Sequence, residues 1–247
     1  MGNKKNIMKK IKSALISLSD KSNLKPLLKI LKKNNIKIIS SGGTFRKINK
    51  LGFNCTEVSK FTGSDEILDG RVKTLHPKIH AGILNKRKNK FHKKDLKKNN
   101  FENIDLVVVN FYPFEETLKQ TNVHEKIVEK IDIGGPTMVR AAAKNYNDVV
   151  VITSTNQYSE LINQLKIHKG STSLTFRKKM SQLAFNQTAY YDAVITNYFN
   201  KISNINFPQK KILYGNLIEN LRYGENPHQI SAIYSSDPNN KLDKLQG

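Results

Sequence analysis

The sequence contains a single cysteine, Cys55, and no apolar run that approaches the roughly 18 residues needed to cross a membrane. One cysteine excludes an intramolecular disulfide and any metal site built from several cysteines. The basic residues 1–12 are followed by an apolar stretch that Ser13, Ser17 and Asp20 interrupt, so this end lacks the apolar core of a secretory signal. From these absences we predict a cytoplasmic protein that has no membrane partner.

Acidic residues are also scarce: 20 Asp and Glu stand against 42 Lys and Arg, which gives a formal net charge of +22. Such an excess favours a nucleic-acid partner, because neutralised phosphates dominate that affinity. Only six of the basic residues are arginine, however, and the many lysines accompany many Asn and Ile. That mixture is what A/T-rich codons produce, so we interpret the charge as surface composition and predict no nucleic-acid partner. The densest basic run, residues 86–98, is expected to form a solvated loop and helix.

At 247 residues the chain is long enough for one large domain or two. Apolar strand-like runs alternate with segments of helical periodicity as far as about residue 200. This alternation predicts an α/β fold, a parallel sheet covered by helices and joined by right-handed crossovers. The expected strands are residues 11–19, 36–40, 53–59, 104–110 and 148–153. The expected helices are one after a cap at Ser22 or Asn23, one carrying Phe45, Ile48 and Leu51, one from Pro136, and residues 155–167 and 172–202.

Past residue 204 the pattern changes to β-like runs at residues 211–218 and 230–235, separated by a polar loop. About forty residues cannot supply an independent core of useful size. We therefore read residues 204–247 as the incomplete start of a second α/β domain, whose strands are expected to be loosely held.

One segment combines a carboxylate, a diglycine, a helix start and a lysine: Ile131-Asp132-Ile133-Gly134-Gly135-Pro136, followed by Arg140 and Lys144. Gly134 and Gly135 permit backbone angles that other residues avoid, and Pro136 suits a first helical position. The N–H groups and positive dipole end of this helix would face an anion or a polarised carbonyl. With Asp132 upstream and Lys144 on the helix, the parts of an acid/base site are present. The alternative is a capped surface helix with solvated charges.

A second glycine-rich turn, Ser41-Gly42-Gly43-Thr44, joins an expected strand to an expected helix that Gly52 closes. Such a turn offers backbone N–H groups to a phosphate. The turn is not a P-loop, because the Gly-Lys-Ser/Thr ending is missing, and it is not a dinucleotide fingerprint, because the third glycine is missing. Taken alone it is a weak indication of a site.

Residues 69–82 begin too polar for a core strand and are stopped by Pro77, so we expect a loop. Sites concentrate in loops. His76 and His80 are four residues apart, but Pro77 between them spoils the helical geometry that a metal would need, and we predict no metal site. The polar side chains of this loop are Asp69, Arg71, Lys73, Thr74 and His76.

Asn110 and Tyr112 follow the clearest buried strand, residues 104–110. Residues just past the carboxyl end of such a strand line the crevice where open α/β sheets bind ligands. Asn110 and Tyr112 are therefore candidate site residues, whereas Phe111 and Phe114 are expected to pack.

Together, six motifs in this order resemble the bifunctional purine-biosynthesis enzyme that joins inosine monophosphate (IMP) cyclohydrolase to aminoimidazole carboxamide ribonucleotide formyltransferase. The resemblance covers essentially the whole chain, with small departures at Ser22-Asn23 and Tyr146. It implies a methylglyoxal-synthase-like cyclohydrolase domain in residues 1–203, the formyltransferase domain beginning in residues 204–247, and a homodimer. The motifs are Ser19-Asp20-Lys21, Ser41-Gly42-Gly43-Thr44, Asp69-Gly70-Arg71-Val72-Lys73-Thr74-Leu75-His76-Pro77, Asn110-Phe111-Tyr112-Pro113-Phe114, residues 131–136 with 140–145, and residues 221–229.

The resemblance implies ring closure of formamido-imidazole carboxamide ribonucleotide to IMP with loss of water. It assigns proton transfer to Lys144 paired with Asp132, and orientation of the reacting carbonyls to Lys73, Thr74 and Tyr112. Acid/base groups and oxyanion donors suffice for this chemistry, so no metal or redox cofactor is expected. The implied substrate-binding residues are Ser19, Asp20, Lys21, Ser41, Gly42, Gly43, Thr44 and Arg71 for phosphate and ribose, and Asn110 and Ile133 for the base. Val72, Gly134 and Gly135 are also implied to bind substrate, as are Arg222 and Tyr223 in the formyltransferase part.

The formyltransferase of the family uses 10-formyltetrahydrofolate as co-substrate, and its catalytic Lys-His and Asn-Pro-Cys-Gly segment would lie downstream of Gly247. We therefore expect this chain to cyclise but not to transfer formyl groups. Two rival readings remain: a methylglyoxal-synthase-like lyase acting on a phosphorylated ketose, and a nucleic-acid-binding protein. One tension concerns Lys144, which lies roughly 12 Å along its helix from Pro136. Asp132 joins it only if the loop folds back beside the helix.

Overall fold

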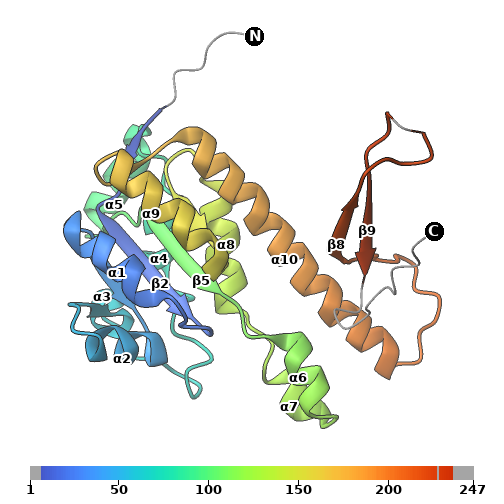
Figure 1. Ribbon diagram of the computed structural model, residues 1–247. Helices are drawn as coiled ribbons and strands as arrows, with labels where there is room; N and C mark the ends of the chain where they lie inside the picture. Colours follow the sequence, from blue (N-terminus) through green and yellow to red (C-terminus); the bar gives the residue numbers. More distant parts are fainter. Residues whose placement is uncertain (1–6, 227, 236–247) are drawn as a thin grey trace. The chain divides into compact units, whose positions relative to one another are not determined.

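The computed structural model describes residues 7–226 and 228–235 (Figure 1). The chain divides into two compact units, residues 1–188 and 189–247. The division falls within the long helix α10 (Leu174–Ile202). Within the described residues, no helix is both long and apolar enough to span a bilayer.

The first unit is organised around a five-stranded sheet in the order β4-β3-β2-β5-β6, with every pairing parallel. The central strands are almost entirely buried, which suits near-continuous apolar runs covered on both faces. The predicted parallel sheet is confirmed, as are four of its five predicted strands. The strands are β2 (Ser13–Leu18), β3 (Lys37–Ser40), β4 (Thr56–Glu57), β5 (Leu106–Asn110) and β6 (Val150–Ile152).

The predicted edge strand at residues 53–59 is mostly wrong. Only Thr56–Glu57 pairs with β3, and the helix α3 (Val58–Thr62) begins directly afterwards. Val58 and Phe61 are buried three residues apart, which is a helical spacing, and Gly63 ends the helix with a positive φ of 78°.

Helices cover the sheet and supply the remaining elements of this unit. In Figure 1, α1 and α9 lie together in front of the sheet, while α4 and α8 pack on each other behind it. The remaining bounds are α1 (Leu24–Lys33), α2 (Gly42–Lys50), α4 (Pro77–Leu84), α5 (Lys90–Lys98), α6 (Phe114–Gln120), α7 (His124–Val128), α8 (Gly134–Lys144), the short 3-10 helix η1 (Thr155–Gln157), α9 (Tyr158–Ile167), and the small antiparallel pair β1 (Lys9–Lys10) and β7 (Ser171–Thr172).

One predicted helix start, one predicted side-chain cap and one predicted loop need correction. Helix α8 begins at Gly134, two residues before the predicted Pro136. Asn23 occupies the N-cap position of α1 in a left-handed conformation, and its side chain makes no capping bond. The second half of the loop predicted at residues 69–82 is the helix α4, because Pro77 takes its first position and His76 Nδ1 accepts a bond of 3.1 Å from the N–H of Lys78.

Arg177 joins several segments at the amino edge of the sheet. Its side chain is fully buried in α10. Its Nε donates to the carbonyl of Tyr146 (2.9 Å), and its Nη2 donates to the carbonyls of Ile7 (3.1 Å) and Asn147 (3.2 Å). Its Nη1 donates to Thr172. One guanidinium thus satisfies carbonyls from three separate parts of the chain.

Replacing Arg177 by alanine is expected to lower the free energy of unfolding by about 3 kcal/mol or more, because several buried carbonyls lose their donors at once. Urea unfolding followed by circular dichroism measures this change. Lys178→Ala is the matched control, since its exposed side chain lies next in the same helix, and it should change stability by less than about 0.5 kcal/mol. A similar loss in both variants would contradict the assignment.

The second unit contains an antiparallel pair of strands, β8 (Asn216–Leu221) and β9 (Ser231–Ser235). Both β-like runs predicted here are therefore present, the first shifted toward the C-terminus. Every residue of β8 is exposed, as expected of a two-stranded ribbon without a covering layer.

Candidate active site at the carboxyl edge of the sheet

The parallel sheet has a topological switch point between β2 and β5. The chain leaves β2 toward β3 and leaves β5 toward β6, in opposite directions, which opens a crevice at the carboxyl ends of these two strands. Leu18 and Asn110 are paired at this point. The residues that follow β2, β3 and β5 thus meet at one edge of the sheet.

Asn110 connects the two sides of the switch point. Its Oδ1 accepts from the backbone N–H groups of Ser19 (2.7 Å) and Asp20 (3.2 Å), and its Nδ2 donates to the carbonyl of Asp20 (2.8 Å). Bonds from the backbone and side chain of Ser22 lower the pKa of the Asp20 carboxyl. The amide of Asn110 therefore shapes the loop that carries the Ser19-Asp20-Lys21 motif, and its contact with a base stays a prediction.

The first turn of α2 gathers cationic side chains. Gly42 has a positive φ of 52°, and a methyl group added there would lie 3.7 Å from Lys73 Nζ. A methyl group added at Gly43 would lie 3.8 Å from Lys21 Nζ and 4.0 Å from Arg46 Nη2. Helix N–H groups, the positive dipole end and three cations suit this turn to binding an anion. Arg46 was missed in the sequence, although it stands four residues beyond Gly42, one helical turn away.

Thr44 holds α2 against β2. Its buried hydroxyl donates to the carbonyl of Leu18 (3.0 Å) and accepts from the N–H of the same residue (2.9 Å). The hydroxyl proton is therefore unavailable to a phosphate, and the predicted binding role of Thr44 is left to its backbone N–H. Ser41 occupies the N-cap position, is largely buried, and makes no side-chain capping bond.

A tight turn at residues 67–72 presents the next set of side chains. Ile67 and Val72 exchange backbone hydrogen bonds of 3.1 and 3.3 Å, so the predicted substrate residue Val72 is part of the bridge that closes the turn. Arg71 leaves the turn to pair with Glu129 (Nη2 to Oε2, 3.5 Å). Lys73 follows directly, with its Nζ 3.9 Å from Glu66 Oε2.

Thr74 and Asp132 meet at the diglycine that begins α8. The Asp132 carboxylate accepts from the N–H of Gly135 (2.8 Å), and a methyl group added at Gly134 would lie 2.5 Å from Thr74 Oγ1. Only glycine allows so close an approach. Burial raises the pKa of the Asp132 carboxyl, while the Gly135 bond and the charge of Lys73 oppose that rise. Lys73, Thr74 and Asp132 therefore lie together as one group.

Lys144 does not join this group in a single chain. It is the exposed last residue of α8, whereas Asp132 lies just before the first. The ten steps from Gly134 to Lys144 span about 15 Å, and they carry the chain from the carboxyl edge of the sheet back to its amino edge. The predicted pairing of Asp132 with Lys144 within one chain is therefore wrong, because the loop does not fold back along the helix.

Two further predicted residues of the first unit, Tyr112 and Ile133, make no described contact with this group. Tyr112 is half exposed, with Lys130 Nζ 5.8 Å from the centre of its ring, and Ile133 is exposed beside the diglycine. Arg222 and Tyr223 follow β8 and belong to the second unit. Their binding roles stay predictions.

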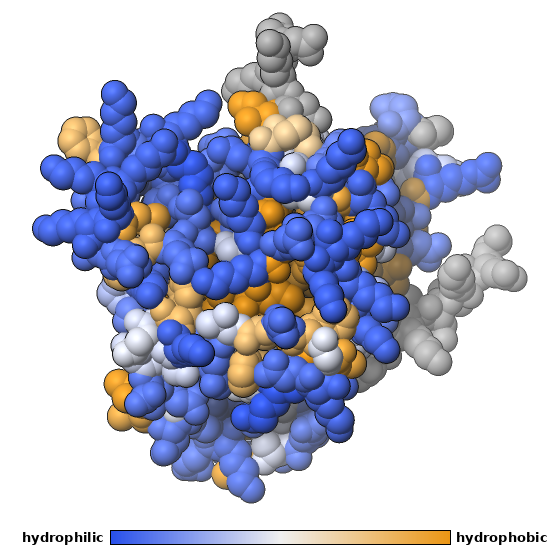
Figure 2. All heavy atoms as spheres, turned by 90° about the vertical axis from the view of Figure 1, so that its left-hand side faces the viewer, coloured by the Kyte–Doolittle hydropathy of each residue, from blue (hydrophilic) through white to orange (hydrophobic). Residues whose placement is uncertain are grey.

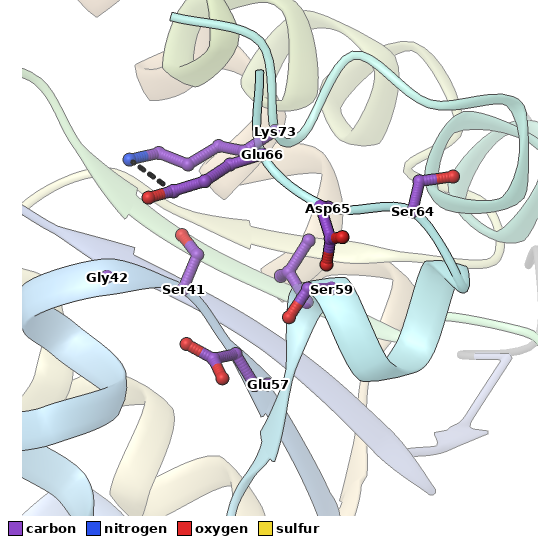
Figure 3. Close-up of a pocket in the computed structure, with 9 residues that line it drawn as sticks. Ser41, Gly42, Glu57, Ser59, Ser64, Asp65, Glu66 and Lys73 are labelled. Atoms are coloured by element: carbon purple, nitrogen blue, oxygen red, sulfur yellow. Dashed lines mark ion pairs between the residues drawn. The ribbon is translucent and has the colours of Figure 1, made fainter. Parts of the chain in front are cut away.

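A cavity of about 180 Å³ adjoins Lys73 and the start of α2 (Figure 3). Three carboxylates line it, and sequence reasoning had missed all of them. Asp65 and Glu66 precede the polar loop by only a few residues, so their nearness to Lys73 along the chain was the available signal. The lining residues are Ser41, Gly42, Glu57, Val58, Ser59, Ser64, Asp65, Glu66 and Lys73.

Comparison with known proteins gives the class and then the family. Residues 23–137 match the family model described as an MGS-like domain, and residues 142–247 match the model of the AICARFT/IMPCHase bienzyme. A solved structure titled "Crystal structure of ForH" is 28% identical with a TM-score of 0.68, covering 76% of this chain and 99% of that one. The fold is therefore the MGS-like α/β fold that the resemblance implied.

The similar relatives carry the name bifunctional purine biosynthesis protein PurH. The protein from Bradyrhizobium diazoefficiens is 44% identical over 228 residues, covering 92% of this chain and 43% of the relative. The protein from Clostridium kluyveri is 47% identical over 226 residues, covering 92% and 44%. The chain belongs to this family of purine biosynthesis proteins, and it spans less than half the length of these relatives.

Proposed function

We propose that this chain is an IMP cyclohydrolase, which closes formamido-imidazole carboxamide ribonucleotide to inosine monophosphate. The observation that carries this proposal is the group of Lys73, Thr74 and Asp132 at the switch point, beside the first turns of α2 and α8. The relatives are named for purine biosynthesis, and one matched model is named for this activity. A group with acid/base and oxyanion functions next to an anion site fits a phosphorylated substrate that loses water.

In the proposed reaction the carboxamide nitrogen of the substrate attacks its formyl carbon. The carboxamide nitrogen loses one proton on attack while the formyl oxygen gains charge. The formamido nitrogen later loses a second proton, and the oxygen takes up both protons and leaves as water. Asp132 is suited to take the proton because burial raises the pKa of its carboxyl. The Lys73 ammonium stabilises the developing oxyanion, and Thr74 orients the carbonyl. The phosphate binds the first turn of α2 with Lys21 and Arg46.

Lys144 takes part in this proposal only through a second copy of the chain. It is too far from Asp132 in its own chain, and its side chain is exposed at the opposite edge of the sheet. A homodimer, which the family resemblance implies, could place Lys144 of one copy at the site of the other. We propose this arrangement as the way in which Lys144 contributes.

We also propose that this chain binds a small ribonucleotide and that its net positive charge does not bind nucleic acid. Figure 2 shows one face of the molecule covered mostly by hydrophilic side chains. In the basic helix α5 no residue is buried and Asp95 stands among the lysines, as in a solvated surface. A salt titration with duplex DNA tests this point, since tight binding with a steep salt slope would contradict it.

The activity is tested by following IMP formation spectrophotometrically from the formylated ribonucleotide. Turnover that depends on intact Lys73 supports the proposal, and its absence from the folded protein defeats it. A phosphorylated ketose serves as the control substrate, because methylglyoxal release from it would favour the lyase that the MGS-like fold also allows.

Lys21→Ala is expected to raise KM by about tenfold with little change in kcat. Its Nζ lies at the first turn of α2, so it contacts a phosphate that carries the same charge in the ground state and in the transition state. Steady-state kinetics provide the measurement, and exposed Lys25 in α1 supplies the matched control, Lys25→Ala. A fall in kcat at unaltered KM would contradict a binding role.

A further inference from the structure

Glu66 and Lys73 flank the turn at residues 67–72 as cross-strand neighbours. The backbone bonds between Ile67 and Val72 close the turn, so the residues just outside this bridge face each other. Gly70 has a positive φ of 83°, and a methyl group added there would lie 3.5 Å from Glu66 Oε2 and 3.6 Å from Lys73 Nζ. Figure 3 shows the two side chains running side by side, with the ion pair at their ends.

The position of the Lys73 ammonium is electrostatically unfavourable without such a partner. Its Nζ lies beside Gly42, at the positive end of α2, where Lys21 and Arg46 add further positive charge. Like charges gathered in this way repel. The carboxylate of Glu66, at 3.9 Å, offsets this repulsion from the side of the turn, while Asp132 faces Lys73 from the side of α8.

We propose that Glu66 is a positioning residue that holds the Lys73 ammonium at the reacting centre and prevents it from swinging into solvent. Its effect on turnover rests on the proposed cyclohydrolase function, whereas its effect on the position of Lys73 does not.

The first experiment measures how accessible the Lys73 ammonium is, and it does not depend on enzyme turnover. The folded protein is acetylated briefly with an N-hydroxysuccinimide ester, and the labelling of each lysine is measured by peptide mass spectrometry. In Glu66→Gln, Lys73 should be labelled about three times faster than in the parent chain, as expected for releasing a partly exposed ion pair. Lys25 is the internal reference. Asp65→Asn is the matched control, since Asp65 lines the same cavity, and it should leave Lys73 labelling unchanged. Equal labelling in all three proteins would overturn the proposal.

The second experiment reads the consequence for turnover. Glu66→Gln should lower kcat about fivefold with KM within about twofold, and Glu66→Asp should recover part of the loss. In the Lys73→Ala background, Glu66→Gln should cause no further loss, because the group that it positions is gone. An equal loss in both backgrounds would contradict a positioning role. Absence of turnover in the parent chain would defeat the cyclohydrolase proposal, and the labelling result would still decide whether Glu66 positions Lys73.

Discussion

Asp132→Asn is expected to lower kcat for ring closure by about 10²-fold or more while leaving the folded protein at least as stable at neutral pH. Asparagine has nearly the same shape, and its Oδ1 still accepts the N–H of Gly135. The change therefore removes the carboxylate that we propose as proton acceptor and keeps the start of α8 intact. A loss of this size is what a general base contributes.

The stability side of this prediction follows from the raised pKa of the Asp132 carboxyl, whose main cause is burial. A raised pKa in the folded state means that the folded protein binds the proton more tightly than the unfolded chain. The stabilising contribution is then fully present below the unfolded pKa and is lost as the pH rises through the folded pKa. At neutral pH the buried, ionised carboxylate lowers the free energy of unfolding, and its replacement by asparagine removes this destabilisation.

Thermal unfolding at pH 7 and at pH 4 tests the predicted stability, and kcat tests the predicted catalytic role. The Tm of Asp132→Asn relative to the parent chain should be more favourable at pH 7 than at pH 4. Asp65→Asn is the control, because it removes a nearby carboxylate outside the diglycine contact. Unchanged kcat in folded Asp132→Asn would remove the residue from the mechanism, and a marked fall in Tm would point to a structural role instead.

The parallel sheet could be predicted from the sequence because its central strands are nearly continuous apolar runs. The run at residues 104–110 has one physical solution, a strand buried on both faces. The edge of the sheet has no such constraint. Residues 53–59 have only one strand neighbour, so the helical spacing of Val58 and Phe61 decides their conformation. At Pro77, a signal read as a stop was the start of a helix, because proline suits both positions.

The same distinction holds for the candidate site. Motifs that are local in sequence could be recognised, whereas contacts between distant segments could not. Lys73, Thr74 and Asp132 lie in motifs that family resemblance could recognise, and the fold brings them together. Which side chains are already engaged depends on contacts between distant segments, such as the bond from Thr44 to Leu18. The ion pair of Glu66 with Lys73 depends on three consecutive positive φ angles in the turn, which composition alone does not fix.

The second large loss of kcat is expected at Lys144, through the assembly of two copies of the chain. In one chain it ends α8 at the amino edge of the sheet, so Lys144→Ala should leave the fold and the Asp132 group undisturbed. If Lys144 serves the site of a second copy, Lys144→Ala should still lower kcat by about 10²-fold or more. A change at a residue so far from its own site would otherwise have no reason to affect the chemistry.

Mixed dimers distinguish a Lys144 that acts at the site of the other copy from a Lys144 whose replacement damages the structure. Two chains with different affinity tags, one carrying Lys144→Ala and the other Asp132→Asn, are co-expressed, and the dimers that contain both are purified. Each mixed dimer has one site that lacks both groups and one that combines an intact Asp132 with an intact Lys144 from the other copy. About half of the parent activity should therefore return, although each variant alone is nearly inactive.

The matched control combines Lys73→Ala with Asp132→Asn. Lys73 and Asp132 belong to one site in one chain. Every site in that mixed dimer therefore lacks one of the two groups, and no activity should return. Recovery in the control, or none in the Lys144 mixture, would show that Lys144 does not act across two chains.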